Sequence, residues 1–145
     1  MENGERILVD ANEHAERVKR AMAVAKSKGV PDFVVNARTD TLLLGGTVDE
    51  ALKRGQLYLA AGACTVLVFG GLARGVRDDE VRQLVEGLDG RISVICRIGA
   101  EGSWLGVKEI KDLNVARISV GPGVWKVGLT AVKKEMERLL EDSSL

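Results

Sequence analysis

The sequence predicts an α/β domain in which buried parallel strands alternate with helices. Four short runs are rich in Val and Ile and nearly continuous in apolar character, which is typical of strands covered on both faces of a parallel sheet. Segments with helical periodicity separate these runs. The predicted strands are Phe33–Ala37, Thr65–Phe69, Ile92–Cys96 and Ala116–Val120.

Length and composition fit one globular domain spanning residues 1–145. Hydrophobic residues make up 46% of the chain, and 21 basic side chains balance 21 acidic ones, so we expect neither a nucleic-acid partner nor an anionic membrane partner. No apolar run approaches the roughly 20 residues of a membrane span. The polar start Met1–Glu5 carries no secretory signal, so we expect a cytoplasmic protein.

Five helices are predicted, and three of them have recognisable starting residues. Asp10 can cap a helix over about residues 11–28, and Asp78 can cap a shorter one. Thr47 and Glu50 have the spacing of a capping box, in which each side chain bonds the other residue's backbone N–H. The last helix carries one apolar stripe, made of Trp125, Leu129, Val132, Met136, Leu139 and Leu140.

The spacing of the strands indicates how the units are arranged. The predicted strands start at residues 33, 65, 92 and 116, which are 32, 27 and 24 residues apart. Eight such units would approach the roughly 250 residues of a TIM-type (β/α)8 barrel. We therefore predict half of such a barrel, with four strands and five helices. The alternative is a complete small open sheet of the flavodoxin or Rossmann kind.

In either fold, ligands bind at the carboxyl ends of the strands, so the residues after each run are the candidates. Arg38 is suited to grip a carboxylate or phosphate with its planar fork, or else it pairs with Asp40 to hold the loop. Gly121 and Gly123 precede the last helix and form either an anion-binding loop or a tight turn. Glu101 is the one acid here that could serve an active site, although a solvated loop position is the simpler interpretation.

Cysteine and histidine offer little chemistry. Cys64 and Cys96 lack CxxC spacing and a neighbouring His, so we expect buried reduced thiols and no metal site. The single histidine, His14, falls in a polar helical stretch and is expected on the surface.

Three segments resemble one known family. They are FVVNARTD at 33–40, YLAAGA at 58–63 and ARISVGPG at 116–123. Their order and separation are similar to the phosphoenolpyruvate mutase and isocitrate lyase superfamily, especially its carboxyphosphonoenolpyruvate phosphonomutase-like members. The resemblance runs from about residue 8 to residue 141.

This resemblance implies an enzyme about twice this length that cleaves or forms C–C or P–C bonds in small 2-oxo or 2-hydroxy carboxylates or phosphonates. The family uses Mg²⁺ and an enolate-like intermediate, and Arg38 matches the arginine that holds the substrate's carboxylate or phosphonate. The family's acidic metal ligands lie in the other half of the barrel, and segment 97–102 departs from the isocitrate lyase pattern. We therefore expect a C-terminal half-barrel that holds no cofactor by itself, with no catalytic residue assigned.

The alternative function is a non-catalytic half-barrel that self-assembles or binds a small carboxylate or phosphonate. A half-barrel has two open sheet edges and a bare inner face, which we expect to expose apolar surface. We therefore expect either a homo-oligomer with its interface on the strands or a missing N-terminal half.

Overall fold

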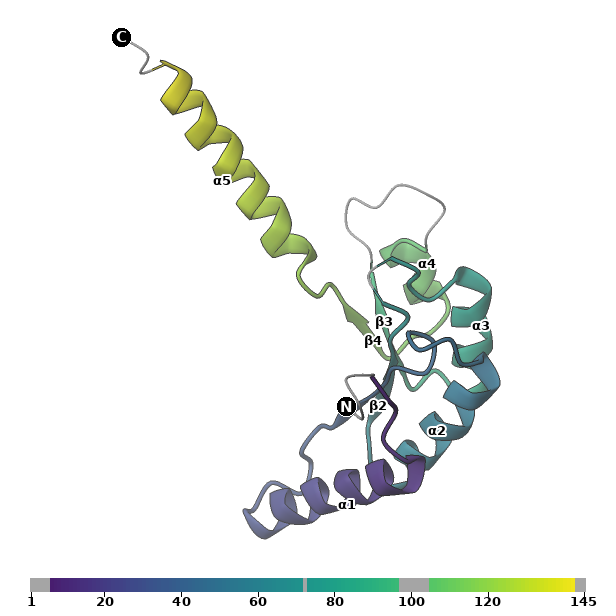
Figure 1. Cartoon of the computed structure of the whole chain (residues 1–145). Helices are drawn as coiled ribbons and strands as arrows, with labels where there is room; N and C mark the ends of the chain where they lie inside the picture. The colour runs from purple at the N-terminus through teal and green to yellow at the C-terminus, as the bar shows by residue number, and fades with distance from the viewer. Residues whose placement is uncertain (1–5, 72, 97–104, 143–145) are drawn as a thin grey trace.

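The computed structural model describes residues 6–71, 73–96 and 105–142. It contains one sheet of four strands, and a helix precedes the first strand and follows each strand (Figure 1). The helices are α1 (Ala11–Ser27), α2 (Val48–Ala60), α3 (Asp78–Gly87), α4 (Val107–Asp112) and α5 (Gly123–Asp142). The strands are β1 (Asn36–Thr39), β2 (Thr65–Val68), β3 (Ile92–Ile95) and β4 (Arg117–Ser119).

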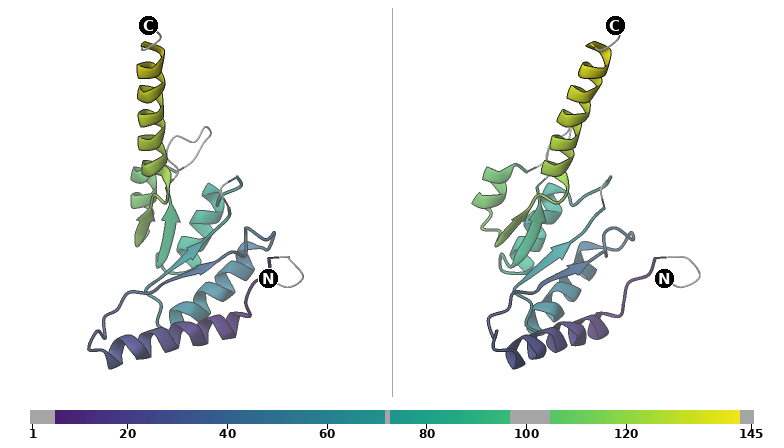
Figure 2. Two further views of the ribbon diagram at one scale, coloured as in Figure 1. Left: turned by 60° about the vertical axis from the view of Figure 1, so that its left-hand side comes forward. Right: turned by 90° about the vertical axis from the view of Figure 1, so that its left-hand side faces the viewer.

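All neighbouring strands are parallel, and their order in space is their order in the chain, β1-β2-β3-β4. An open doubly wound sheet would reverse its strand order at a switch point, whereas a barrel adds each strand beside the last. α2, α3 and α4 lie along one side of the sheet and leave the other side uncovered (Figures 1 and 2). This arrangement supports the predicted half-barrel over the open sheet.

The core lies between the sheet and the helices on its outer side. Val66 of β2 and Leu84 of α3 are fully buried there, as is Ala51 of α2. Gly55 of α2 permits close packing, because a Cβ at that position would come within 2.9 Å of the side chain of Leu88. Small residues on α2 therefore let α3 and β2 approach closely.

Two of the predicted helix starts are confirmed. The Asp10 carboxylate accepts hydrogen bonds from the backbone N–H groups of Asn12 and Glu13, at 2.9 and 3.1 Å. The capping box of α2 is complete: Glu50 Oε2 accepts from the Thr47 N–H at 2.8 Å, and Thr47 Oγ1 accepts from the Glu50 N–H at 3.2 Å. Local side-chain bonds thus fix where α1 and α2 begin.

The prediction that Asp78 caps α3 is wrong. Asp78 is the first helical residue, and Arg77 occupies the N-cap position. The Arg77 N–H donates to Glu80 Oε2 at 2.8 Å. Asp78 Oδ1 instead accepts from the backbone N–H of Leu105 at 3.2 Å, so its side chain ties α3 to the segment before α4.

The first strand begins later than predicted, whereas the other three fall within their predicted runs. Pairing with β2 starts at Asn36, opposite Thr65, and β1 ends at Thr39. Phe33 and Val34 precede the ladder and are 48% and 60% exposed. The apolar run misplaces β1 because two of its four residues, Asn36 and Arg38, are polar and lie on the face without helices.

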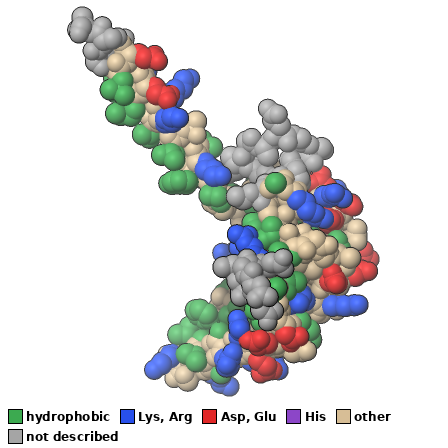
Figure 3. All heavy atoms as spheres, viewed as in Figure 1, with side chains coloured by type: hydrophobic (Ala, Val, Ile, Leu, Met, Phe, Trp, Pro, Cys, Tyr) green, Lys and Arg blue, Asp and Glu red, His purple; other side chains and the backbone are tan. Residues whose placement is uncertain are grey.

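α5 projects away from the rest of the structure (Figures 1 and 2). Every residue from 124 to 141 is exposed. Hydrophobic side chains gather along one side of α5 (Figure 3). Among the described residues, no helix is both long enough and apolar enough to cross a membrane.

The loop after β2 supplies a test of the packing. A Cβ at Gly70 would come 1.8 Å from the carbonyl oxygen of Gly75, so Gly70→Ala must displace backbone. We expect it to lower the free energy of unfolding by about 2 kcal/mol or more in urea denaturation. Arg20→Ala on the exposed side of α1 is the control, and we expect it to change the free energy of unfolding by less than about 0.5 kcal/mol. Equal effects of the two substitutions would contradict this packing.

Candidate functional site

The inner face of the sheet, which faces away from the helices, is mostly polar, with Leu67 and Ile95 as its apolar side chains. Residues alternate between faces along each strand, so Ala37 and Val66 turn toward the helices while Asn36 and Thr65 turn inward. Thr65 Oγ1 donates to Asn36 Oδ1 at 2.8 Å. Further along the sheet, the hydroxyls of Ser93 and Ser119 lie 3.0 Å apart. Cross-strand hydrogen bonds thus join β1 to β2 and β3 to β4 on this face.

This polarity corrects the expectation of an apolar inner face. Among the described strand residues, no large apolar side chain is exposed, and Leu67 and Ile95 are half-buried. The exposed apolar side chains concentrate on α5 instead. They are Val124, Trp125, Val127, Leu129, Val132, Met136, Leu139 and Leu140.

Arg38 lies at the carboxyl end of β1, on the inner face. Its Nε donates to Asp40 Oδ1 at 2.6 Å, and its Nη2 donates to Asp40 Oδ2 at 3.0 Å. This bidentate hydrogen bonding raises the pKa of the Arg38 guanidinium above its usual range. The predicted Arg38–Asp40 pair is therefore present.

Phe69 supports the guanidinium from the next strand along. The Arg38 Cζ lies 4.2 Å from the centre of the Phe69 ring, in a cation–π contact. The Phe69 N–H donates to the Thr39 carbonyl at 2.9 Å, which fixes the end of β2 beside the end of β1. Sequence reasoning missed Phe69 because the contact joins two strands. Its position at the carboxyl end of a predicted strand, where ligands bind in this kind of fold, could have marked Phe69 as a candidate.

Arg38 keeps donors for a ligand. Asp40 takes Nε and one hydrogen of Nη2, which leaves Nη1 and the second hydrogen of Nη2. No other acceptor within the described residues binds them, and the side chain is 50% exposed. One complete edge of the guanidinium therefore remains open to a planar anion.

There is room beside Arg38. Arg38 and Asp40 border a hollow of about 390 Å³, whose other walls include residues 6–9 and Arg54. Arg54 donates from Nη1 to the Val9 carbonyl at 2.8 Å, which holds the segment before α1 against α2. The hollow is large enough for a small carboxylate.

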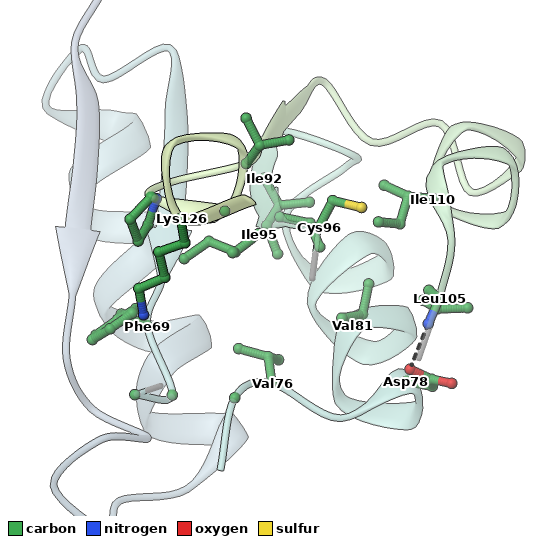
Figure 4. A pocket seen from close by; sticks show the side chains of 17 residues that line it. Phe69, Val76, Asp78, Val81, Ile92, Ile95, Cys96, Leu105, Ile110 and Lys126 are labelled. Atoms are coloured by element: carbon green, nitrogen blue, oxygen red, sulfur yellow. Dashed lines mark hydrogen bonds between the residues drawn. The ribbon is translucent and has the colours of Figure 1, made fainter. Parts of the chain in front are cut away.

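Gly121 and Gly123 lie at the start of α5 and form a tight turn. Gly121 has a φ of 49°, and the Gly123 N–H donates to the Val120 carbonyl at 3.0 Å. The proposed anion loop therefore lacks one of its donors, and its binding role stays a prediction. Gly123 borders a mostly apolar cavity of about 230 Å³, into which Lys126 extends toward Phe69 (Figure 4). Lys126, in the first turn of α5, was also missed from sequence.

The sequence of the chain matches one family. The family model described as phosphoenolpyruvate phosphomutase matches residues 1–140. The chain belongs to this family. Phosphonopyruvate hydrolase of Variovorax sp. (strain Pal2) is 31% identical over 144 residues, which are 99% of this chain and 47% of that protein.

Solved structures agree on the fold. A 2,3-dimethylmalate lyase of the PEP mutase/isocitrate lyase superfamily has a TM-score of 0.78 at 25% identity, covering 94% of this chain and 46% of the other. A phosphonopyruvate hydrolase in complex with oxalate and Mg²⁺ has a TM-score of 0.72 at 26% identity, covering 93% and 46%. This chain thus spans about half the length of the relatives it matches. The half-barrel prediction is confirmed, and the open-sheet alternative is wrong.

The described residues of this family member do not fit a Mg²⁺ site. They contain no group of three His, Cys, Asp or Glu side chains that could hold a metal ion. The acids near the carboxyl ends of the strands already have partners: Asp40 binds Arg38, Asp78 binds the Leu105 N–H, and Glu80 binds Arg74. Glu101 and segment 97–102 lie outside the described residues.

The cysteines are free thiols, as expected. Cys96 is buried and borders the apolar cavity, whereas Cys64 is only half-buried. The expectation of two buried thiols is therefore wrong for Cys64.

His14 is not the surface residue that the sequence suggested. Its ring stacks on Tyr58 of α2 with 4.4 Å between the ring centres. Burial lowers the pKa of the His14 imidazole, and the positive charges of Arg17 and Arg54 lower it further. A polar helical stretch hid this contact, because Tyr58 lies 44 positions along the chain.

The lowered pKa of His14 predicts a pH dependence of stability. The unfolded chain has an ordinary histidine pKa near 6.5, so below about pH 6.5 it takes up a proton more readily than the folded protein. The free energy of unfolding should therefore fall as the pH drops from about 7 toward 5. His14→Phe keeps a ring against Tyr58 but cannot bind a proton. The variant should therefore lack this fall in the free energy of unfolding between about pH 7 and pH 5, as measured by urea denaturation. The same pH dependence of unfolding in wild type and in His14→Phe would contradict a lowered pKa for His14.

Proposed function

We propose that this chain supplies the anion-binding half of an enzyme active site. The substrates are small 2-oxo or 2-hydroxy carboxylates or phosphonates, and the reaction cleaves or forms a C–C or P–C bond. The family membership supports this class, as does the similarity to a phosphonopyruvate hydrolase. A 2-methylisocitrate lyase from Escherichia coli (strain K12) is 48% identical over 48 residues, which are 33% of this chain and 16% of that protein. The observation that carries the proposal is the half-occupied guanidinium of Arg38 at the carboxyl end of β1.

The geometry suits Arg38 to binding and orienting a substrate. A carboxylate can accept two parallel hydrogen bonds from its open edge, which fixes both the position and the plane of the bound group. Holding a substrate in one orientation lowers the entropic part of a reaction barrier. Asp40 and Phe69 hold the guanidinium in place before the ligand arrives, so less conformational freedom is lost on binding.

Bond cleavage needs groups beyond those described. The acids at this edge are engaged by Arg38, Arg74 and a backbone N–H, so none of them is placed as a general base. This observation also favours the second candidate function, a non-catalytic module that binds a small anion through Arg38. The two functions differ in turnover, while both require Arg38.

The binding role of Arg38 is testable by NMR titration of the full chain with oxalate. We expect oxalate to shift the Arg38 Nε resonance, and Arg38→Lys to weaken binding about tenfold because the two-pronged geometry is lost. Arg17→Lys, an exposed arginine on α1, is the control and should leave affinity unchanged. Equal oxalate affinity in wild type and Arg38→Ala would end the proposal.

We propose further that a second copy of the chain covers the apolar stripe of α5. α2 packs against β1 and β2, and α3 packs against β3, whereas α5 leaves the sheet after β4 with its whole stripe exposed. Full burial of each large apolar side chain contributes about 1.5–3 kcal/mol, so leaving six in water is costly. Exchange of α5 between two copies around a two-fold axis would cover the stripes of both and the outer side of both β4 strands.

Light scattering tests this assembly. We expect a particle of twice the 15.6 kDa chain mass at tens of micromolar. Leu129→Glu with Met136→Glu should shift the population to monomer, because both charges fall on the stripe. Lys134→Glu lies on the opposite side of α5 and should leave the dimer intact. A wild-type monomer, or dissociation caused equally by Lys134→Glu, would contradict the proposal.

A further inference from the structure

We propose that Asp40 is a specificity-determining residue that biases the Arg38 site toward carboxylates and against dianionic phosphonates. The inference rests on Arg38 being the anion clamp, and it narrows the substrate class that the family leaves open. Three observations carry it: the edge of Arg38 that Asp40 occupies, the charge that Asp40 brings, and the ring that holds the guanidinium.

The first observation concerns which hydrogen bonds remain. Asp40 binds the side edge of the guanidinium through Nε and Nη2, at 2.6 and 3.0 Å. The end edge, formed by Nη1 and the second hydrogen of Nη2, presents two parallel donors. One carboxylate, with two coplanar oxygens, satisfies this edge completely. A phosphonate uses two oxygens there and must place its third oxygen elsewhere.

The second observation concerns charge. The Asp40 carboxylate is 32% exposed and lies against Arg38, so the pair is close to neutral as seen from the end edge. A ligand group with one negative charge still gains the two hydrogen bonds. A second negative charge gains no further attraction from the pair and is repelled by Asp40. At about 6 Å and an intermediate effective dielectric constant, one such repulsion amounts to a factor of about ten in affinity.

The third observation concerns orientation. Phe69 covers one face of the guanidinium at 4.2 Å, and the Phe69 backbone is bonded to Thr39. The ring therefore limits tilting of the guanidinium plane, while Asp40 limits rotation within the plane. Phe69 acts as a positioning residue: it affects how firmly any anion is held, but carries no charge with which to distinguish one anion from another.

Other cations near the site do not affect a comparison of carboxylate and phosphonate binding between wild type and an Asp40 variant. Arg6 and Arg54 border the same hollow, and Lys126 extends toward Phe69 from the neighbouring cavity (Figure 4). They are present in wild type and in an Asp40 variant alike. A change in the ratio of two affinities on replacing Asp40 therefore reports on Asp40.

The experiment titrates the full chain with malonate and with phosphonoacetate. Phosphonoacetate has a phosphonate group in place of one of the two carboxylates of malonate. The Arg38 Nε resonance reports binding at about pH 9.5, above the second pKa of a phosphonate, which is higher than that of a phosphate ester, so that the group carries two charges. We expect wild type to prefer malonate. Asp40→Asn, which keeps the shape but removes the charge, should shift the ratio toward phosphonoacetate by about tenfold.

Three further proteins serve as controls. Asp112→Asn removes the same charge on α4, far from Arg38 in the fold, and should leave the ratio unchanged. Phe69→Leu should weaken both ligands several-fold at an unchanged ratio. Asp40→Glu keeps the charge and should keep the malonate preference. If Asp40→Asn fails to fold, wild type still tests the inference, because phosphonoacetate should bind more tightly at about pH 6, with one fewer charge on its phosphonate, than at about pH 9.5.

The outcomes separate this inference from the proposed function. If both ligands shift Arg38 but the ratio is the same in wild type and Asp40→Asn, Arg38 remains the clamp and Asp40 does not set specificity. A wild-type preference for phosphonoacetate would overturn the inference in the same way. If neither ligand shifts Arg38, the clamp itself fails, and the inference fails with it.

Discussion

Alternation along four parallel strands is the constraint on which the rest of the molecule depends. Successive side chains point to opposite faces, so each strand must serve an apolar face and an inner face at once. Ala37, Val66 and Ile92 pack under the helices, while Asn36, Thr65 and Arg38 occupy the inner side. Burial of the first set fixes the register, and the register in turn sets where Arg38 emerges at the end of β1.

The site depends on this register in a second way. Because β1 and β2 are parallel and paired from Asn36 and Thr65 onward, their carboxyl ends finish side by side. Phe69 therefore arrives over the guanidinium of Arg38, which Asp40 binds from its own loop. One arginine is thus held by a neighbour in sequence and a neighbour in space. The anion-binding role proposed for Arg38 needs such a fixed guanidinium.

Much of the fold could be predicted from sequence, because Val- and Ile-rich strand runs and capped helices have local signatures, although the strands prove to be covered by helices on one face only. The capping bonds of Asp10, and those between Thr47 and Glu50, join residues at most three positions apart. Both predicted helix starts are therefore confirmed. Asp78 could not be assigned correctly, since its partner Leu105 lies on a distant segment. The contact of Phe69 with Arg38 depends on strand pairing in the same way. The stripe of α5 was visible in the sequence, but its periodicity is the same whether the helix packs on its own sheet or against another copy.

The most direct test of anion binding by Arg38 is a crystal structure of the full chain with oxalate. We expect one oxalate carboxylate to lie in the plane of the Arg38 guanidinium, bonded to Nη1 and Nη2, while Asp40 stays bound to Nε and the Phe69 ring stays against one face of the guanidinium. Oxalate bound at the Gly121–Gly123 turn with Arg38 untouched, or oxalate that displaces Asp40 from Arg38, would contradict it.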